Sequence, residues 1–170
     1  SVEAIADRTL PHNLDAERSV LGAMLLDATA WPKVAAIVRG EDYYRAGHRL
    51  IHEAMLRLVE AGTAIDFVLL REELQRAGEL DECGGPAYLA ALADGMPRMS
   101  NVEHYAEVVR EKARLRGLIF AGNKLLVGAY EASVPASLLV EGGIHALLVY
   151  ADTRQHVVTQ AGKDALDYVM

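Results

Sequence analysis

Two histidines stand at the spacing from which a helix can hold a metal ion. His48 and His52 are four residues apart, so on a helix both side chains would project from one face. The zinc motif of helical metalloproteases needs a glutamate directly after the first histidine, and Arg49 occupies that position. No cysteine or third histidine lies nearby in the sequence. We therefore interpret the pair as two partly exposed helix histidines and predict no metal site.

The sequence contains no motif with the spacing that phosphate binding or nucleophilic catalysis requires. A P-loop needs a glycine five residues before its Gly-Lys pair and a hydroxyl residue after it. The one Gly-Lys pair, Gly162–Lys163, has Val157 and Asp164 at those positions. The only cysteine, Cys83, lies among acidic residues, which disfavour a thiolate. We expect this chain to have no catalytic residues and to bind no cofactor.

Basic residues are densest in the sequence between positions 110 and 124. They are Arg110, Lys112, Arg114, Arg116 and Lys124. Glutamates interleave with them, and Glu107–Arg110 and Glu111–Arg114 are three apart, as in helical ion pairs worth a few tenths of a kcal/mol (~0.3) each. Such a pattern fits either a solvated, salt-bridged helix face or a charged docking surface.

The element that carries these charges is a long predicted helix. Residues 101–130 contain no proline and repeat apolar side chains at helical spacing, which predicts a helix of roughly 45 Å. A second helix over residues 135–151, with Ser133 as its expected cap, is apolar nearly all round. The short connection predicts an antiparallel hairpin. Gly142–Gly143 either weakens the second helix or permits a close approach that a Cβ would block.

This hairpin has more apolar surface than its two helices can hide from each other. Part of that surface is expected to meet a second copy of the chain. The alternative is that it packs only on its own domain.

Five shorter helices are predicted upstream, each with a polar start or a glycine end. They begin after Asn13, at Ala30 with Thr29 as cap, near Arg45, after Asp66 with Gly78 as the expected end, and at Gly84–Gly85–Pro86. We predict an all-α fold in which a compact multi-helix head is followed by the long antiparallel hairpin. The expected divisions are a flexible tail over 1–9, the head over 10–95, the hairpin over 101–151 and a linker over 152–170, with a hinge around Pro97.

Composition excludes several classes of protein. The 170-residue chain carries a net charge of −7 and has a pI near 5.3, which argues against a primary phosphate-binding surface, so DNA would bind weakly if at all. One cysteine allows no intrachain disulfide, which suits the cytoplasm. No apolar run is long enough to span a bilayer, and no secretory signal opens the sequence. We expect a cytoplasmic protein with no membrane partner.

Four sequence blocks carry a family resemblance over residues 10–150. They are LPHNLDAERSVLGAMLLD, EDYYRAGHRLIHEAMLRLVEAG, AIDFVLLREELQRAGELDECGGPAYLAALAD and NVEHYAEVVREKARLRGLI. In order and spacing they resemble the N-terminal domain of DnaB-type bacterial replicative DNA helicases. Gly117 and Gly142–Gly143 depart from the family's pattern.

The resemblance implies a non-catalytic collar domain of a hexameric helicase. In that family the hairpins pair as dimers, and three dimers form a collar that docks the C-terminal domain of primase and contacts a helicase loader. ATP and magnesium would belong to a motor domain beyond the linker, which this chain does not include.

The resemblance assigns functional roles to groups of residues in this sequence rather than to single residues. Those matching the paired seams of the hairpin are Tyr105, Val109, Leu115, Leu118, Ile119, Leu126, Ile144 and Leu148. Those expected to contact primase are Glu107, Arg110, Glu111 and Arg114. The alternative to a collar is a small nucleic-acid-binding module that uses the helices around residues 78–85 as a helix-turn-helix.

Overall fold

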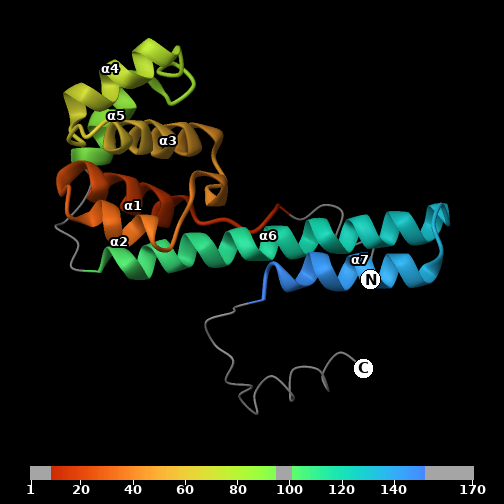
Figure 1. Cartoon of the computed structure of the whole chain (residues 1–170). Helices are drawn as coiled ribbons and strands as arrows, with labels where there is room; N and C mark the ends of the chain where they lie inside the picture. Colours follow the sequence, from red (N-terminus) through yellow and green to blue (C-terminus); the bar gives the residue numbers. More distant parts are fainter. Residues whose placement is uncertain (1–8, 95–100, 152–170) are drawn as a thin grey trace. The chain divides into compact units, whose positions relative to one another are not determined.

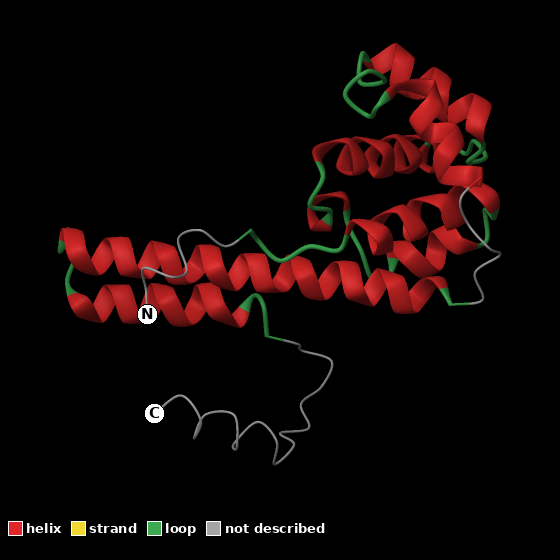
Figure 2. Ribbon diagram, turned by 180° about the vertical axis from the view of Figure 1, so that it is seen from behind, coloured by secondary structure: helices red, strands yellow, loops and turns green. Residues whose placement is uncertain are grey.

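The computed structural model describes residues 9–94 and 101–151, and helices dominate both ranges (Figure 1). In chain order they are α1 (Leu14–Leu26), α2 (Ala30–Ala35), the 3-10 helix η2 (Gly40–Asp42), α3 (Ala46–Glu60), α4 (Phe67–Ala77), α5 (Gly85–Asp94), α6 (Val102–Glu131) and α7 (Ala136–Leu148). These two ranges contain no strand (Figure 2). The predicted all-α fold is confirmed, whereas the predictions for residues 1–8, 95–100 and 152–170 lie outside the described residues.

Local side-chain chemistry sets most of the predicted helix ends. The Asn13 side chain accepts a hydrogen bond from the Ala16 amide at 2.9 Å, and Asp66 accepts one from the Leu69 amide at 2.8 Å. Gly78 ends α4 in the left-handed region, with a φ of 72°. These three helix ends confirm the predicted signals.

Two predicted caps are wrong. Thr29 occupies the N-cap position of α2, but its side chain accepts no hydrogen bond from a helix amide. Its amide and its hydroxyl instead donate to the Asp27 carboxylate, at 2.9 and 2.7 Å. Pro135 occupies the N-cap position of α7 in place of Ser133, and no side chain caps that helix. A short sequence match to a cap names a suitable residue, but it does not show whether the hydroxyl oxygen accepts from a helix amide.

The described residues form two compact units that meet between Arg116 and Gly117, inside α6. The first half of α6 therefore belongs to the head, because Val102, Ala106 and Val109 are buried in the head core. Our predicted head ended at residue 95, since the sequence around Pro97 carried the clearest break. The hairpin unit begins at Gly117 and includes α7.

The head core is built mainly from α1, α3, α4 and α5. Helix α3 packs against α1 and α4, and α5 packs against α1 and α4. The largest fully buried apolar side chains are Tyr43, Leu21, Met24, Ile51, Met55, Leu70, Leu74, Leu89 and Leu92. The apolar stripes that predicted these helices are the faces that meet in this core.

Glycines define how α6 and α7 approach each other in the hairpin unit. A Cβ added at Gly117 would overlap the Tyr150 ring, one at Gly128 would lie 2.8 Å from Leu139 Cδ2, and one at Gly143 would lie 2.7 Å from Leu125 Cδ2. The contacts run in opposite directions along the two helices, so the hairpin is antiparallel, as predicted (Figure 1). Gly142 has open space around it, so only Gly143 has the predicted close-approach role.

The two adjacent glycines provide a matched pair of variants. We expect Gly142→Ala to raise the free energy of unfolding by about 1 kcal/mol, the difference in helix propensity between glycine and alanine. Gly143→Ala should gain clearly less, because its methyl group displaces Leu125. Urea denaturation followed by circular dichroism measures both changes, and equal gains at the two positions would contradict the proposed packing.

Candidate functional site

Large apolar side chains are exposed along both helices of the hairpin unit and next to the two ends of α7. They are Leu118, Phe120, Leu126, Val127, Tyr130, Val134, Leu138, Val140, Ile144, Leu147, Leu148 and Val149, and we call this set the hairpin surface. In the described head, by contrast, the corresponding exposed side chains are only Leu14, Leu26, Val59 and Val68. Single exposed apolar residues are ordinary, but such a concentration on one unit marks an interaction surface.

A cavity of about 540 Å³ lies between α6 and α7 within this unit. Ala121, Leu125 and Gly128 line it from α6, and Leu139 and Gly143 line it from α7. The two helices therefore leave apolar atoms uncovered between them as well as on their outer faces.

The residues predicted to pair the hairpins divide between the two units. Leu118, Leu126, Ile144 and Leu148 are exposed by 40, 47, 56 and 60% and belong to the hairpin surface. Leu115 and Ile119 are partly buried.

Two of the predicted pairing residues pack into the head instead. Val109 is 1% exposed inside the head core, so including it in a pairing surface was wrong. Tyr105 is partly buried against the same core. Periodicity placed these side chains on one helix face but could not tell which neighbour covers that face.

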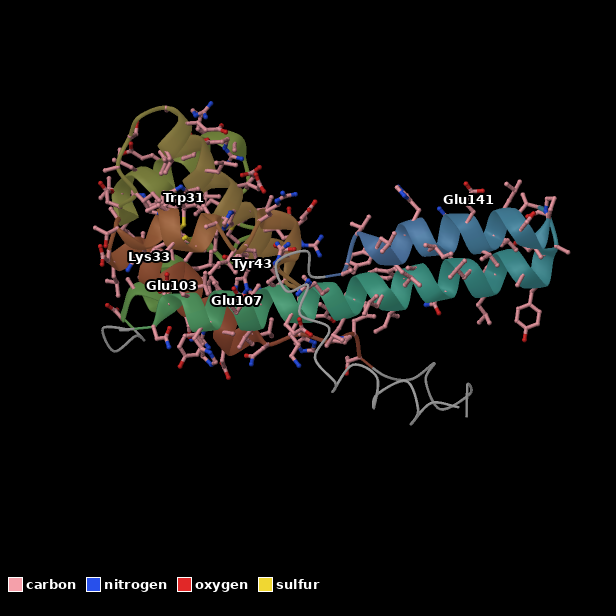
Figure 3. The ribbon with its side chains drawn as sticks, turned by 60° about the horizontal axis from the view of Figure 1, so that its bottom comes forward. Trp31, Lys33, Tyr43, Glu103, Glu107 and Glu141 are labelled. Atoms are coloured by element: carbon pink, nitrogen blue, oxygen red, sulfur yellow. The ribbon has the colours of Figure 1, made fainter. Side chains whose placement is uncertain are left out.

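The predicted docking charges also differ in their surroundings. Glu107 and Glu111 are exposed, and Figure 3 shows Glu107 on the outside of α6. Arg114 lies 3.7 Å from Glu111, which confirms that three-apart pair. Arg110 instead donates to the Ile37 carbonyl at 2.9 Å and lies 3.6 Å from Asp42, so its guanidinium is held by the head.

Arg116, from the same basic cluster, is buried. Its guanidinium donates to the carbonyls of Pro11 and Asp42 at 2.8 and 2.6 Å and lies over the Tyr44 ring at 5.6 Å. Burial lowers the pKa of this guanidinium. Arg110 and Arg116 therefore have structural roles, and the basic cluster is not one continuous docking surface.

A buried polar network, which sequence reasoning missed, lies between α1, α3 and α5. Glu17 is 2% exposed, and its carboxyl group accepts from the amides of Tyr44 and Arg45 at 2.7 and 3.4 Å. His48 places Nδ1 2.6 Å from Glu17 Oε2 and Nε2 2.6 Å from the Tyr88 hydroxyl. The interpretation of His48 as partly exposed was wrong. A usable signal existed, because Glu17 falls between Leu14 and Leu21 on the apolar face of α1.

His52 is also buried, so its predicted exposure was wrong as well. Its ring lies 5.1 Å from Trp31 and 5.3 Å from Tyr43, and burial lowers its pKa to about 4. The described residues contain no group of three metal-ligating side chains. Burial, together with Glu79 and Glu82, raises the pKa of the Cys83 thiol to about 11, which confirms that its environment disfavours a thiolate.

Comparison with known proteins agrees with the geometry of the head. The family described as "DnaB-like helicase N terminal domain" matches residues 9–111. The chain belongs to this family. The "Crystal structure of the N-terminal domain of DnaB helicase from Mycobacterium tuberculosis" superimposes with a TM-score of 0.78 at 34% identity, covering 82% of this chain and 99% of that one.

Full-length relatives extend the comparison. The "Replicative DNA helicase DnaB" of Geobacillus stearothermophilus is 38% identical over 139 residues, which cover 82% of this chain and 31% of the relative. The "Replicative DNA helicase DnaC" of Bacillus subtilis is 32% identical over 164 residues, covering 96% and 36%. The chain thus spans about a third of the length of these DnaB-type relatives. Within the described residues, no helix is long and apolar enough to cross a membrane.

The Glu17 network predicts a large cost for one conservative substitution. Glu17→Gln keeps the side-chain volume but places an amide NH2 where an oxygen now accepts, so we expect a loss of about 2 kcal/mol of unfolding free energy. Glu72→Gln, on the exposed face of α4, is the matched control and should change little. Urea denaturation of the two variants checks this, and equal stability would contradict the role given to Glu17.

Proposed function

We propose that this chain is the non-catalytic collar domain of a hexameric replicative DNA helicase. In this proposal the hairpin surface pairs two copies of the chain, and three such dimers form the collar of the ring. ATP and magnesium would be used by the motor domain of the longer protein. Membership of the DnaB-like family supports the helicase context, and the exposed apolar side chains of the hairpin unit support the pairing.

The single observation that carries the proposal is the exposure of Leu126, Ile144 and Leu148 on both helices of one unit. Burying apolar surface stabilises an association by about 25 cal/mol per Å² before the costs of ordering are subtracted. Two hairpins that each expose several leucines and valines would therefore lower their free energy by packing these side chains against each other. That this chain takes part in a ring is what the family resemblance implies. The pairing of two hairpins is therefore tested separately.

A second part of the proposal is that the collar recruits the C-terminal domain of primase, with a helicase loader as a further partner. Of the four charges predicted to dock primase, Glu107 and Glu111 are exposed on α6, and Arg114, held near Glu111, adds a cation beside them. Arg110 is left out of the tested variant because the head holds its guanidinium. The helix-turn-helix alternative is not proposed, since the net charge of −7 opposes phosphate binding.

Self-association is tested by light scattering across a range of protein concentrations. We expect the mass of the wild-type chain to rise with concentration, whereas a Leu126→Ser, Leu148→Ser variant should stay monomeric. Val68→Ser, which changes an equally exposed apolar residue of the head, should behave as the wild type. A mass that stays at that of one chain even at the highest concentration, or association that is equal in the double variant, would contradict pairing through this surface.

Primase docking is tested by calorimetric titration with the C-terminal domain of the cognate primase at two salt concentrations. We expect saturable binding that weakens with salt and drops about fivefold in a Glu107→Gln, Glu111→Gln variant, because exposed charges contribute screened interactions. Glu103→Gln, also exposed on α6 (Figure 3), is the control. The absence of binding, or binding that ignores the double substitution, would reject these residues as the docking site.

A further inference from the structure

A separate cavity of about 330 Å³ opens on the head between α2, η2 and α3. Its walls combine apolar and aromatic groups with two acidic residues and one basic residue, namely Trp31, His52, Leu56, Glu41, Glu53 and Arg39, with Val38 beside them. None of these residues belongs to the hairpin surface or to the Glu17 network. The volume lies at the lower end of the range for ligand pockets and suits one long side chain.

The acidic part of the cavity lacks a strong internal partner. Among the described residues, Glu53 makes no hydrogen bond or ion pair. Its carboxylate lies against Gly40, where an added Cβ would overlap Oε1, so the glycine leaves room for it. Glu41 and Arg39 are 4.0 Å apart, which is long for an ion pair, and both side chains are 77% exposed. This ion pair is therefore weak.

The aromatic part of the cavity is buried and uncharged. Trp31 and His52 are 9% and 3% exposed, with ring centroids 5.1 Å apart. Burial lowers the pKa of His52 to about 4, so the ring is neutral at neutral pH and does not repel a cation. Nδ1 of His52 lies 3.3 Å from the Tyr43 hydroxyl, while its Nε2 has no hydrogen-bond partner among the described residues.

We propose that this cavity binds an arginine side chain of a partner polypeptide. A tryptophan face beside a carboxylate attracts a cation, and tryptophan is the strongest aromatic for this contact. Arginine fits better than lysine because its planar guanidinium can stack on a ring while it donates two parallel hydrogen bonds to Glu53. Val38 and Leu56 offer apolar contact to the methylene stem. The proposal does not depend on the collar function, since it concerns only the head.

The chain offers a specific reporter, because Trp31 is its only tryptophan. We would titrate the full 170-residue chain with the capped tripeptide acetyl-Gly-Arg-Gly-amide at constant ionic strength, and follow Trp31 fluorescence and its indole N–H resonance. Matched peptides carry glutamine or lysine in place of arginine. We expect saturable shifts with the arginine peptide, several-fold weaker binding of the lysine peptide and no saturation with glutamine.

Variants locate the binding. Glu53→Gln should weaken the arginine peptide about tenfold, the loss expected for a charge-assisted hydrogen bond, and Arg39→Ala should strengthen it by removing a neighbouring cation. Glu60→Gln, exposed near the end of α3, should leave it unchanged. No saturation with arginine, equal binding of the glutamine or lysine peptide, or unaltered binding by the Glu53 variant would overturn the proposal. The peptide comparison uses the unchanged chain, so it remains decisive even where a variant folds poorly.

Discussion

The buried carboxyl group of Glu17 is the interaction on which the head depends. Removing such a group from water costs several kcal/mol unless hydrogen bonds replace the lost ones. Here the amides of Tyr44 and Arg45, at the start of α3, supply two of them and His48 supplies another. The positive end of a helix favours an acceptor at this place. Because the donors lie on one element and Glu17 on another, the network fixes α1 against the N-terminus of α3.

The same network extends across the head. His48 continues from Glu17 to the hydroxyl of Tyr88, so α5 is tied to α1 and α3 by a single line of contacts. Arg116 links α6 to two other segments of the head by donating hydrogen bonds to the carbonyls of Pro11 and Asp42. Among the described residues, no fully buried side-chain nitrogen or oxygen lacks a partner. Such satisfied interiors favour one arrangement over its competitors.

The two units thus differ in how much apolar surface they leave exposed. The described head residues leave no fully buried side-chain nitrogen or oxygen without a partner and cover most of their apolar side chains, whereas the hairpin unit exposes apolar side chains from both of its helices. Close approach at Gly143 brings α6 and α7 together without hiding Leu126, Ile144 or Leu148. A head with a covered core and a hairpin with exposed apolar side chains are what the proposed assembly role requires.

Sequence reasoning recovered the features that local pattern determines. The helical stripes, the Asn13 and Asp66 caps, the Gly78 terminus and the antiparallel hairpin all follow from residues close together in the chain. It failed where partners are far apart. Glu17 and His48 are separated by 31 residues, and Arg116 and Pro11 by 105, so no local signal links them. The misplacement of Val109 has the same origin, because one apolar stripe on α6 serves two different neighbours along its length.

Hydrogen–deuterium exchange of the chain at low and high protein concentration tests the central claim most directly. If the head is stable in a single chain and the hairpin surface binds a second copy, amides of α1, α3 and α5 should exchange equally slowly at both concentrations. Amides of α7 should exchange more slowly at the higher concentration. Slow exchange in α7 at a concentration where light scattering shows a monomer would contradict this account, because it would mean that one chain already stabilises the hairpin alone.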